Sequence, residues 1–296
     1  MHIRVRSGPG SFVVAAVVLV ASCVPGRKPA QKPAVDIPAL QRDIIARLSG
    51  REEIKPGLKL PNRADLENRK AAREYLIDVW TWLDLSVLTQ DYSAEGENLF
   101  AVLKATKPSG ETIVLGAHYD TSRNSPGAND NATGAALVTA AAAELRQTAP
   151  RTRDLIFVLF DEEERGLRGS RAFAQKLKDE GLKIHSVHTV DQMGWDQDND
   201  RAVELEIPYE GAVALYERAA KMLAAPITIL VTKEAGSDHS AFRRLGFPAV
   251  GLTEEYRNKD TTPYIHRPGD TFETVQFDYL ASSTRLVVKV LRLLTR

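Results

Sequence analysis

Strand-forming segments alternate with helix-forming segments along most of this chain, and this alternation limits the possible folds more than any other feature. The segment 155–160 (LIFVLF) is apolar at every position, which predicts a strand buried on both faces. Further strands are predicted at 98–105, 112–117, 184–190 and 249–252, and the segment 184–190 is followed by a strand, a helix and a strand that ends near Val231. Helices are predicted at 65–87, 132–146, 170–179 and 275–294.

Buried strands that are separated by helices are typical of a mostly parallel sheet with helices on both faces. We therefore expect an α/β fold, a three-layer sandwich with a mixed, largely parallel sheet. The chain of 296 residues shows no internal repeat and no second block of composition. A single domain of this size can bury a substantial core, and we predict that it covers residues 41–296.

The N-terminal residues predict export. Arg4 and Arg6 precede an apolar stretch, 12–21, which has the length of a signal peptide and is too short to span a membrane comfortably. The stretch ends in the residues VASC, which resemble the lipobox of bacterial lipoproteins. That resemblance predicts a signal peptide at 1–22 and a lipid-modified Cys23 at the start of the mature chain. An ordinary secretory signal with an incidental cysteine is the alternative.

The segment 23–40 is rich in proline, which favours extended chain and predicts a tether between a membrane and the domain. The expected location is therefore the bacterial cell envelope, on the periplasmic side or the cell surface. Lys+Arg and Asp+Glu number 39 each, so no basic excess indicates a nucleic-acid partner. Cys23 is the only cysteine, which excludes a disulfide within the chain.

Five short segments carry side chains that could bind a metal, and most of them directly follow a predicted strand. They are 118–120 (HYD), 127–134 (GANDNATG), 161–167 (DEEERGL), Asp191 and 237–240 (SDHS). Each has an ordinary explanation when taken alone, such as a surface pair, a helix cap or a solvated acidic loop. Together they would converge at the carboxyl ends of the strands, where open α/β sheets place their sites. Imidazoles and carboxylates without a thiolate suit a catalytic zinc site.

The segments GAHYD, PGANDNATG, EERGLRGS, VDQMG and SDHSAF resemble, in the same order, the motifs of the co-catalytic dizinc aminopeptidase family. Relatives of that family include glutamate carboxypeptidases, glutaminyl cyclases and the transferrin receptor ectodomain. The resemblance covers about residues 97–280. It implies the zinc exopeptidase fold and two Zn²⁺ ions per chain.

The resemblance also implies a set of metal ligands. His118 and Asp191 correspond to the ligands of one zinc ion, and Glu164 and His239 to those of the other. Asp130 corresponds to the carboxylate that bridges the two ions. The family pattern further implies a cis peptide bond between Asp130 and the residue that follows it.

Other positions take supporting roles by the same resemblance. Glu163 corresponds to the general base, and Asp120 to the carboxylate that orients the first histidine ligand. His266 lies in a downstream segment, HRPGDT, and is expected either to contact the substrate or to be a structural histidine held by the aspartate four residues later. Asp161 and Glu162 fall outside the matching pair and are left as loop residues.

These assignments imply a metallopeptidase that removes residues from peptides with a free N-terminus. A glutaminyl-peptide cyclotransferase is one alternative, although such relatives lack the histidine found here as His118. A carboxypeptidase or dipeptidase would need a cationic pocket, to which Arg165, Arg168 or Arg257 could contribute. A non-catalytic binding module would have lost metal ligands, and all the corresponding positions are filled here. The sequence does not indicate an oligomeric state.

Overall fold

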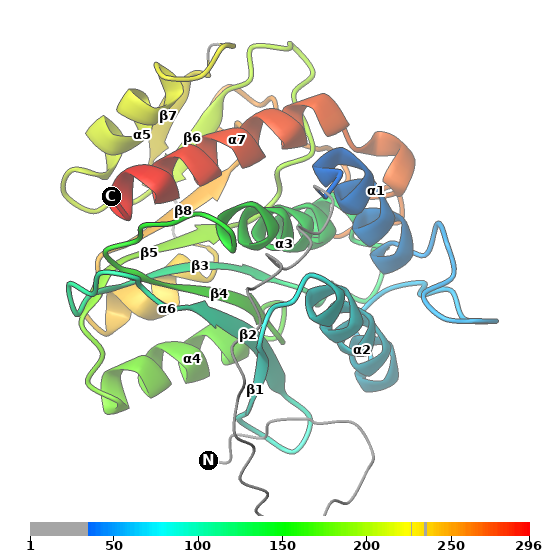
Figure 1. Cartoon of the computed structure of the whole chain (residues 1–296). Helices are drawn as coiled ribbons and strands as arrows, with labels where there is room; N and C mark the ends of the chain where they lie inside the picture. The colour runs from blue at the N-terminus through cyan, green and yellow to red at the C-terminus, as the bar shows by residue number, and fades with distance from the viewer. Residues whose placement is uncertain (1–34, 226, 234–235) are drawn as a thin grey trace, which may run out of the picture.

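A computed structural model describes residues 35–225, 227–233 and 236–296 (Figure 1). The predicted signal peptide, Cys23 and most of the predicted tether lie outside the described residues. The strands are β1 (Val87–Asp91), β2 (Glu97–Leu103), β3 (Thr112–His118), β4 (Asp154–Phe160), β5 (Ile184–Val190), β6 (Val203–Glu206), β7 (Ile229–Thr232) and β8 (Ala249–Thr253). In the described part of the chain they form one sheet, in the order β1-β2-β4-β3-β5-β8-β6-β7.

The centre of this sheet is parallel and its two sides are mixed. Strands β4, β3, β5 and β8 pair in parallel, so their carboxyl ends lie at the same edge of the sheet. On one side, β2 runs antiparallel to both β4 and β1. On the other side, β6 runs antiparallel to β8 and parallel to β7. The prediction of a mixed, largely parallel sheet is confirmed.

Helices cover both faces of the sheet, which confirms the three-layer architecture (Figure 1). One face is covered by α1 (Ile37–Leu48), α2 (Leu66–Trp82), α3 (Gly134–Leu145) and α7 (Phe277–Leu294), with α5 (Ala212–Ala220) beside α7. The other face is covered by α4 (Arg168–Asp179) and α6 (His239–Arg244). Two short segments, η1 (Ala128–Thr133) and η2 (Phe272–Thr274), precede α3 and α7. Among the described helices, none combines the length and the apolar composition that crossing a bilayer requires.

The central strands β3 and β4 are apolar along most of their length because both of their faces are buried. In β3, Ile113 and Leu115 belong to the core beneath α3 and α7, whereas Val114 belongs to the core beneath α4 and α6. Successive side chains of a strand point to opposite faces, so a two-sided core requires apolar residues at consecutive positions. The central strands are thereby fixed in register, which in turn fixes the residues at their ends.

Several element boundaries differ from the predictions. The helix predicted at 65–87 ends at Trp82, and Asp84 has a positive φ of 59° that a helix cannot continue through. Helix α1 was not predicted, and it begins at Ile37 inside the segment expected to be tether. Pro38 lies in its first turn, where the missing N–H costs no helical hydrogen bond, and the side chain of Asp36 caps the helix start.

Candidate metal centre and active-site pocket

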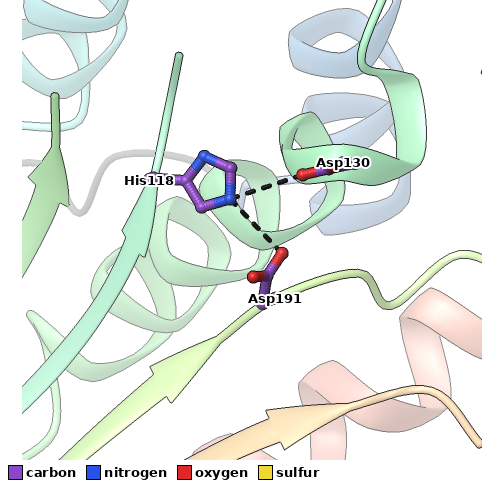
Figure 2. A group of neighbouring side chains, drawn as sticks. All are labelled: His118, Asp130 and Asp191. Carbon is purple, nitrogen blue, oxygen red and sulfur yellow. Dashed lines mark hydrogen bonds and ion pairs between the residues drawn. The ribbon is translucent and has the colours of Figure 1, made fainter. Parts of the chain in front are cut away.

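Three acidic and imidazole side chains meet at the carboxyl edge of the sheet (Figure 2). His118 is the last residue of β3, Asp191 directly follows β5, and Asp130 lies in the turn before α3. The Nε2 atom of His118 lies 3.4 Å from Oδ1 of Asp130 and 3.3 Å from Oδ1 of Asp191. The structure therefore brings together three of the five residues that were predicted to bind metal.

A second group lies on the other side of Asp130. The Nε2 atom of His266 lies 3.2 Å from Oδ2 of Asp130 and 3.2 Å from Oε1 of Glu164. The two oxygens of Asp130 thus face different histidines, Oδ1 toward His118 and Oδ2 toward His266. A carboxylate in this position can bridge two metal ions, which is the role predicted for Asp130.

The donor atoms of both groups fit a divalent metal such as zinc. In each group the ligand atoms lie within 4.8 Å of one another. Two ligands at the usual zinc distance of about 2.0–2.1 Å in tetrahedral geometry are about 3.3 Å apart. The four N···O distances given above range from 3.2 to 3.4 Å. Imidazole and carboxylate donors without thiolate also match the composition of catalytic zinc sites.

Among the described residues, His239 belongs to neither group, although it was predicted to be a ligand. It is the first residue of α6, its side chain is fully buried, and its Nδ1 lies 3.5 Å from Oε2 of Glu206. A Cβ added to Gly251 would lie 2.6 Å from that Nδ1, so the ring lies directly against the backbone of β8. His266, which was expected to contact substrate, occupies the place that the prediction had given to His239. Both histidines follow Glu164 in the chain, so sequence order could not distinguish them.

Asp120 holds both the first histidine and the loop after β4. Its Oδ1 accepts a hydrogen bond of 3.0 Å from the N–H of Glu163, and its Oδ2 accepts one of 3.2 Å from the N–H of Glu164. The same Oδ1 lies 3.4 Å from Nδ1 of His118. This position suits the predicted role of orienting the histidine, and it adds a second role in placing the two glutamates.

Asp270 holds the turn that carries Asp130. Its Oδ1 accepts a hydrogen bond of 2.7 Å from the N–H of Asn129, and its Oδ2 accepts one of 3.0 Å from the N–H of Asp130. The peptide bond between Asp130 and Asn131 is cis, as the family resemblance implied. Asp270 thus supports the turn through backbone amides, whereas the alternative expectation had it holding His266.

A pocket of about 670 Å³ opens over both groups of candidate ligands. Its lining includes Asp130, Glu163, Glu164, Asp191, Gln192, Glu206, Tyr256 and His266. Burial raises the pKa of Glu163 to about 10, with neighbouring carboxylates adding to the effect and His118 opposing it. A bound dication would stabilise the carboxylate form and lower that pKa. Glu163 thus lines the pocket beside the candidate ligands, and its role as a general base stays a prediction.

The carboxylates of the site favour positive charge close to them. Burial opposes protonation of His118, yet Asp191 and the other nearby carboxylates raise its pKa well above the ordinary value. Hydrogen bonds to Asp130 and Glu164 raise the pKa of His266 to about 10. The pKa of Asp130 is lowered, because the two histidines outweigh the effect of burial. Positive charge is thus favoured on both sides of Asp130, where metal ions would supply it.

Asp161 and Glu162 have a structural role that the sequence analysis missed. Both are buried, and Arg69 on α2 places its Nε 2.9 Å from Oδ1 of Asp161 and its Nη2 3.4 Å from Oε1 of Glu162. This buried cluster ties α2 to the start of the loop that carries Glu163 and Glu164. The position of Arg69 within a predicted amphipathic helix could have indicated a buried ion pair. Its partners could not be identified from the sequence, because they lie more than ninety positions away.

Glu254 is a second supporting residue that was missed. It follows β8, it is fully buried, and its Oε2 accepts hydrogen bonds from Nδ2 of Asn129 (2.8 Å) and from the N–H of Gly194 (3.3 Å). Burial raises its pKa to about 8. It links the turn before α3 to the loop after β5, so it supports both Asp130 and Asp191. Its position directly after a predicted strand was a signal that could have identified it.

Comparison with known proteins gives a family match over most of the described chain. Residues 98–291 match the model of "Peptidase family M28". A probable leucine aminopeptidase of Arthroderma otae is 29% identical over 209 residues, which cover 64% of this chain and 55% of that protein. The chain spans about half the length of most of the curated relatives that it matches.

Two solved structures show the same fold. A zinc aminopeptidase from Bacillus subtilis has a TM-score of 0.62 at 22% identity, over 68% of this chain and 50% of that one. A glutaminyl cyclase of Porphyromonas gingivalis has a TM-score of 0.67 at 17% identity, over 86% of this chain and 97% of that one. At these identities the two likenesses support the fold alone.

Proposed function

The chain belongs to peptidase family M28, and we propose that it is a zinc-dependent aminopeptidase that hydrolyses the first bond of peptides with a free N-terminus. The observation that carries this proposal is the shared position of Asp130 between two ligand groups, His118 with Asp191 and Glu164 with His266. Two zinc ions per chain would fit these groups. A curated relative named as a probable leucine aminopeptidase and the fold of a zinc aminopeptidase agree with the proposal.

Each side chain of the site then has a chemical task. Bound metal ions would lower the pKa of a shared water molecule and polarise the scissile carbonyl group. Glu163, which lines the pocket, accepts the proton of that water and returns it to the departing amine. Asp120 orients His118 and the amides of the loop, and Asp270 holds the turn of Asp130. These supports keep the reacting groups in a fixed geometry, which is where much of the rate advantage comes from.

The charge of the pocket favours the N-terminal end of a peptide. Glu163, Glu164, Asp191 and Glu206 all line it. Glu164 and Asp191 are candidate metal ligands, so Glu163 and Glu206 are the carboxylates left to attract a protonated α-amino group. Among the described lining residues there is no lysine or arginine to bind the carboxylate of a peptide C-terminus. The bond nearest to the amino group is therefore the one presented to Glu163.

The alternative function, that of a glutaminyl cyclase, is supported only by similarity of fold. That similarity covers 97% of the Porphyromonas gingivalis enzyme. Cyclases among the relatives are expected to bind a single zinc ion and to lack the histidine that stands here as His118. In this chain His118 is present, and it forms a complete group with Asp130 and Asp191. The presence of both ligand groups favours the peptidase.

The proposal is tested by comparing one peptide in three forms: free, N-acetylated and C-amidated. We expect acetylation to lower kcat/KM by about 10–100-fold, since it removes a charge-assisted contact, and amidation to change it little. Glu163→Gln should retain the bound metal and lower kcat by about 10²–10⁴-fold. A chelator should abolish the activity, and zinc should restore it.

Other outcomes would identify a different enzyme. Rapid cleavage of the acetylated peptide with resistance of the amide would indicate a carboxypeptidase. Release of ammonia from an N-terminal glutamine without hydrolysis of the peptide bond would indicate a cyclase. Loss of zinc in Glu163→Gln, with an unchanged rate per bound metal, would mean that this residue is a ligand rather than the base.

We further propose that the chain is an exported lipoprotein of the bacterial envelope, anchored through Cys23. The support is the sequence alone: a positive N-terminal region, a short apolar stretch and the residues VASC. Lipid attachment would place the pocket outside the cytoplasm, where peptides in the envelope could reach it.

A further inference from the structure

A second cluster of carboxylates lies outside the ligand groups described above, where two loops meet beside the sheet. One loop connects β5 to β6, and the other follows β8. Because β6 and β8 pair antiparallel, with Glu204 opposite Thr253, the start of β6 lies beside the end of β8 and the two loops come together. The carboxylates of the cluster are Asp196, Asp198 and Asp200 in the first loop and Glu255 and Asp260 in the second.

These five carboxylates form two overlapping groups. One oxygen from each of Asp196, Asp198 and Asp200 lies within 4.8 Å of the others, and the same holds for Asp198, Glu255 and Asp260. Asp198 belongs to both groups. Within the described residues, no lysine, arginine or histidine lies at ion-pair distance from any of the five. Their mutual repulsion is therefore not balanced by an ion pair with a described side chain.

Glu255 is the residue that distinguishes this cluster from an ordinary acidic surface. Its side chain is directed into the cluster and is only 3% exposed. The Oε1 atom accepts a hydrogen bond from Nδ2 of Asn258, but the buried Oε2 atom has no hydrogen-bond partner in the described structure. Burying a carboxylate oxygen without a partner costs free energy, because the oxygen loses its hydrogen bonds to water and forms none with the protein. A cation beside Asp198 and Asp260 would supply the missing partner.

We propose that Asp198, Glu255 and Asp260 bind a calcium ion, with Asp196 and Asp200 adding negative charge beside it. All the donors are oxygen atoms, and hard cations such as Ca²⁺ prefer them to nitrogen or sulfur. Asp198 is exposed, so water molecules can complete the six to eight ligands that Ca²⁺ takes. Mg²⁺ demands a stricter octahedral geometry, which a set drawn from two loops meets less readily.

Asp260 already orders the loop that it faces. Its Oδ1 accepts hydrogen bonds from Nε1 of Trp195 (3.1 Å) and the N–H of Gln197 (3.0 Å), and its Oδ2 accepts one from the N–H of Asp198 (3.2 Å). These contacts hold Asp198 close to the second loop before any ion binds. The ligand atoms are therefore partly preorganised, which reduces the entropy lost on binding.

The calcium site would stabilise the wall of the active-site pocket. Tyr256 directly follows Glu255, lines the pocket and donates a hydrogen bond of 2.6 Å from its hydroxyl to Oε1 of Gln192. Gln192 in turn follows Asp191, a candidate zinc ligand. A calcium ion would thus join the two loops that lead into this wall. It would act on stability and loop order rather than on the chemical step.

Direct binding tests the proposal on the protein saturated with zinc, so that Ca²⁺ cannot occupy the zinc groups. Isothermal titration calorimetry with CaCl₂ should show one ion per chain, and MgCl₂ should bind at least about tenfold more weakly. Glu255→Gln should weaken calcium binding by about tenfold or more, since affinity follows the ligand charge. Glu74→Gln, an exposed glutamate on α2, is the matched control and should bind calcium unchanged.

Thermal unfolding separates an ion site from a structural cluster. Calcium at about 100 times its Kd should raise the Tm of the zinc-loaded protein by about 5–10 °C. In calcium-free buffer, Glu255→Gln should keep or raise the Tm, since it removes one repelling charge, and it should lose the calcium-dependent rise. The proposal is overturned if millimolar calcium gives neither heat nor a Tm shift, or if Glu255→Gln and Asp198→Asn bind calcium as the parent does. None of these outcomes depends on the peptidase activity.

Discussion

At the scale of single residues, the site depends on which atom of each side chain faces which neighbour. Asp130 directs Oδ1 toward His118 and Oδ2 toward His266, so one carboxylate joins two groups that come from distant parts of the chain. His118 and Asp191 could be placed from the sequence, because each ends or follows a buried strand of the parallel centre. His266 could not be placed, since it lies in a long connection between β8 and α7.

The two histidines give the sharpest prediction at this scale. We expect His266→Ala to reduce bound zinc from two ions toward one per chain and to lower kcat/KM by at least about 100-fold, because one ligand group loses its imidazole. His239→Ala should keep both ions and instead destabilise the fold by about 2–4 kcal/mol, as for other large-to-small changes in a core. Metal analysis after dialysis and urea unfolding provide the two measurements. The reverse pattern would show that His239, as first predicted, is the ligand.

At the scale of secondary-structure elements, helices and loops outside the sheet hold the catalytic loop in place. The loop after β4 is attached to α2 through Arg69 and to the segment after β3 through Asp120. The neighbouring carboxylate of Asp161 is so deeply buried that its pKa is raised to about 7, although Arg69 opposes the shift. Arg69 therefore neutralises charge that would otherwise disfavour this packing.

Replacing this arginine should destabilise the protein. Arg69→Met leaves the buried carboxylate of Asp161 without its ion-pair partner, whereas Glu162 keeps Arg165 and Arg168. We expect a loss of about 3–5 kcal/mol in the free energy of unfolding, measured with urea. Arg285→Met, at an exposed position of α7, serves as the control and should change stability by less than about 0.5 kcal/mol. Equal stability of the two variants would mean that α2 is held by its apolar contacts alone.

At the scale of the whole molecule, one sheet and its two layers of helices form the body, and the proposed membrane attachment lies at the N-terminus. Helix α1 begins at Ile37, so the proposed tether between Cys23 and the body is shorter than the predicted 23–40. In this proposal the anchor is the lipid attached to Cys23.

The anchoring proposal is tested by expressing the full chain with Cys23→Ser. We expect the unmodified chain to sediment with membranes after a high-salt wash and the variant to appear in the soluble fraction, since stable anchoring requires covalent lipid. The peptidase activity per molecule should be the same for both. Membrane retention of the variant under the same wash would show that contacts other than lipid hold the protein.

The amino-acid sequence by itself determined the fold class, the parallel centre of the sheet and the residues at its carboxyl edge. These follow from local rules: a strand buried on both faces is apolar throughout, and parallel strands end at a common edge. His118, Asp130, Glu164 and Asp191 were found in this way and by their motifs. The structure places all four in the two ligand groups, and Asp130, Glu164 and Asp191 also line the pocket.

Only the tertiary structure decided which side chains of the long connections enter the site. It placed His266 rather than His239 in a ligand group, gave Asp161 and Glu162 a buried cation, and brought Glu255 and Asp260 against Asp198. Loops have no periodicity that links sequence to position, so their side chains are placed by contacts with residues far away in the chain, such as the hydrogen bond from the N–H of Asn129 to Asp270, 141 positions later. The positions of the strands follow from their local sequence pattern, whereas the positions of the loop side chains depend on tertiary contacts.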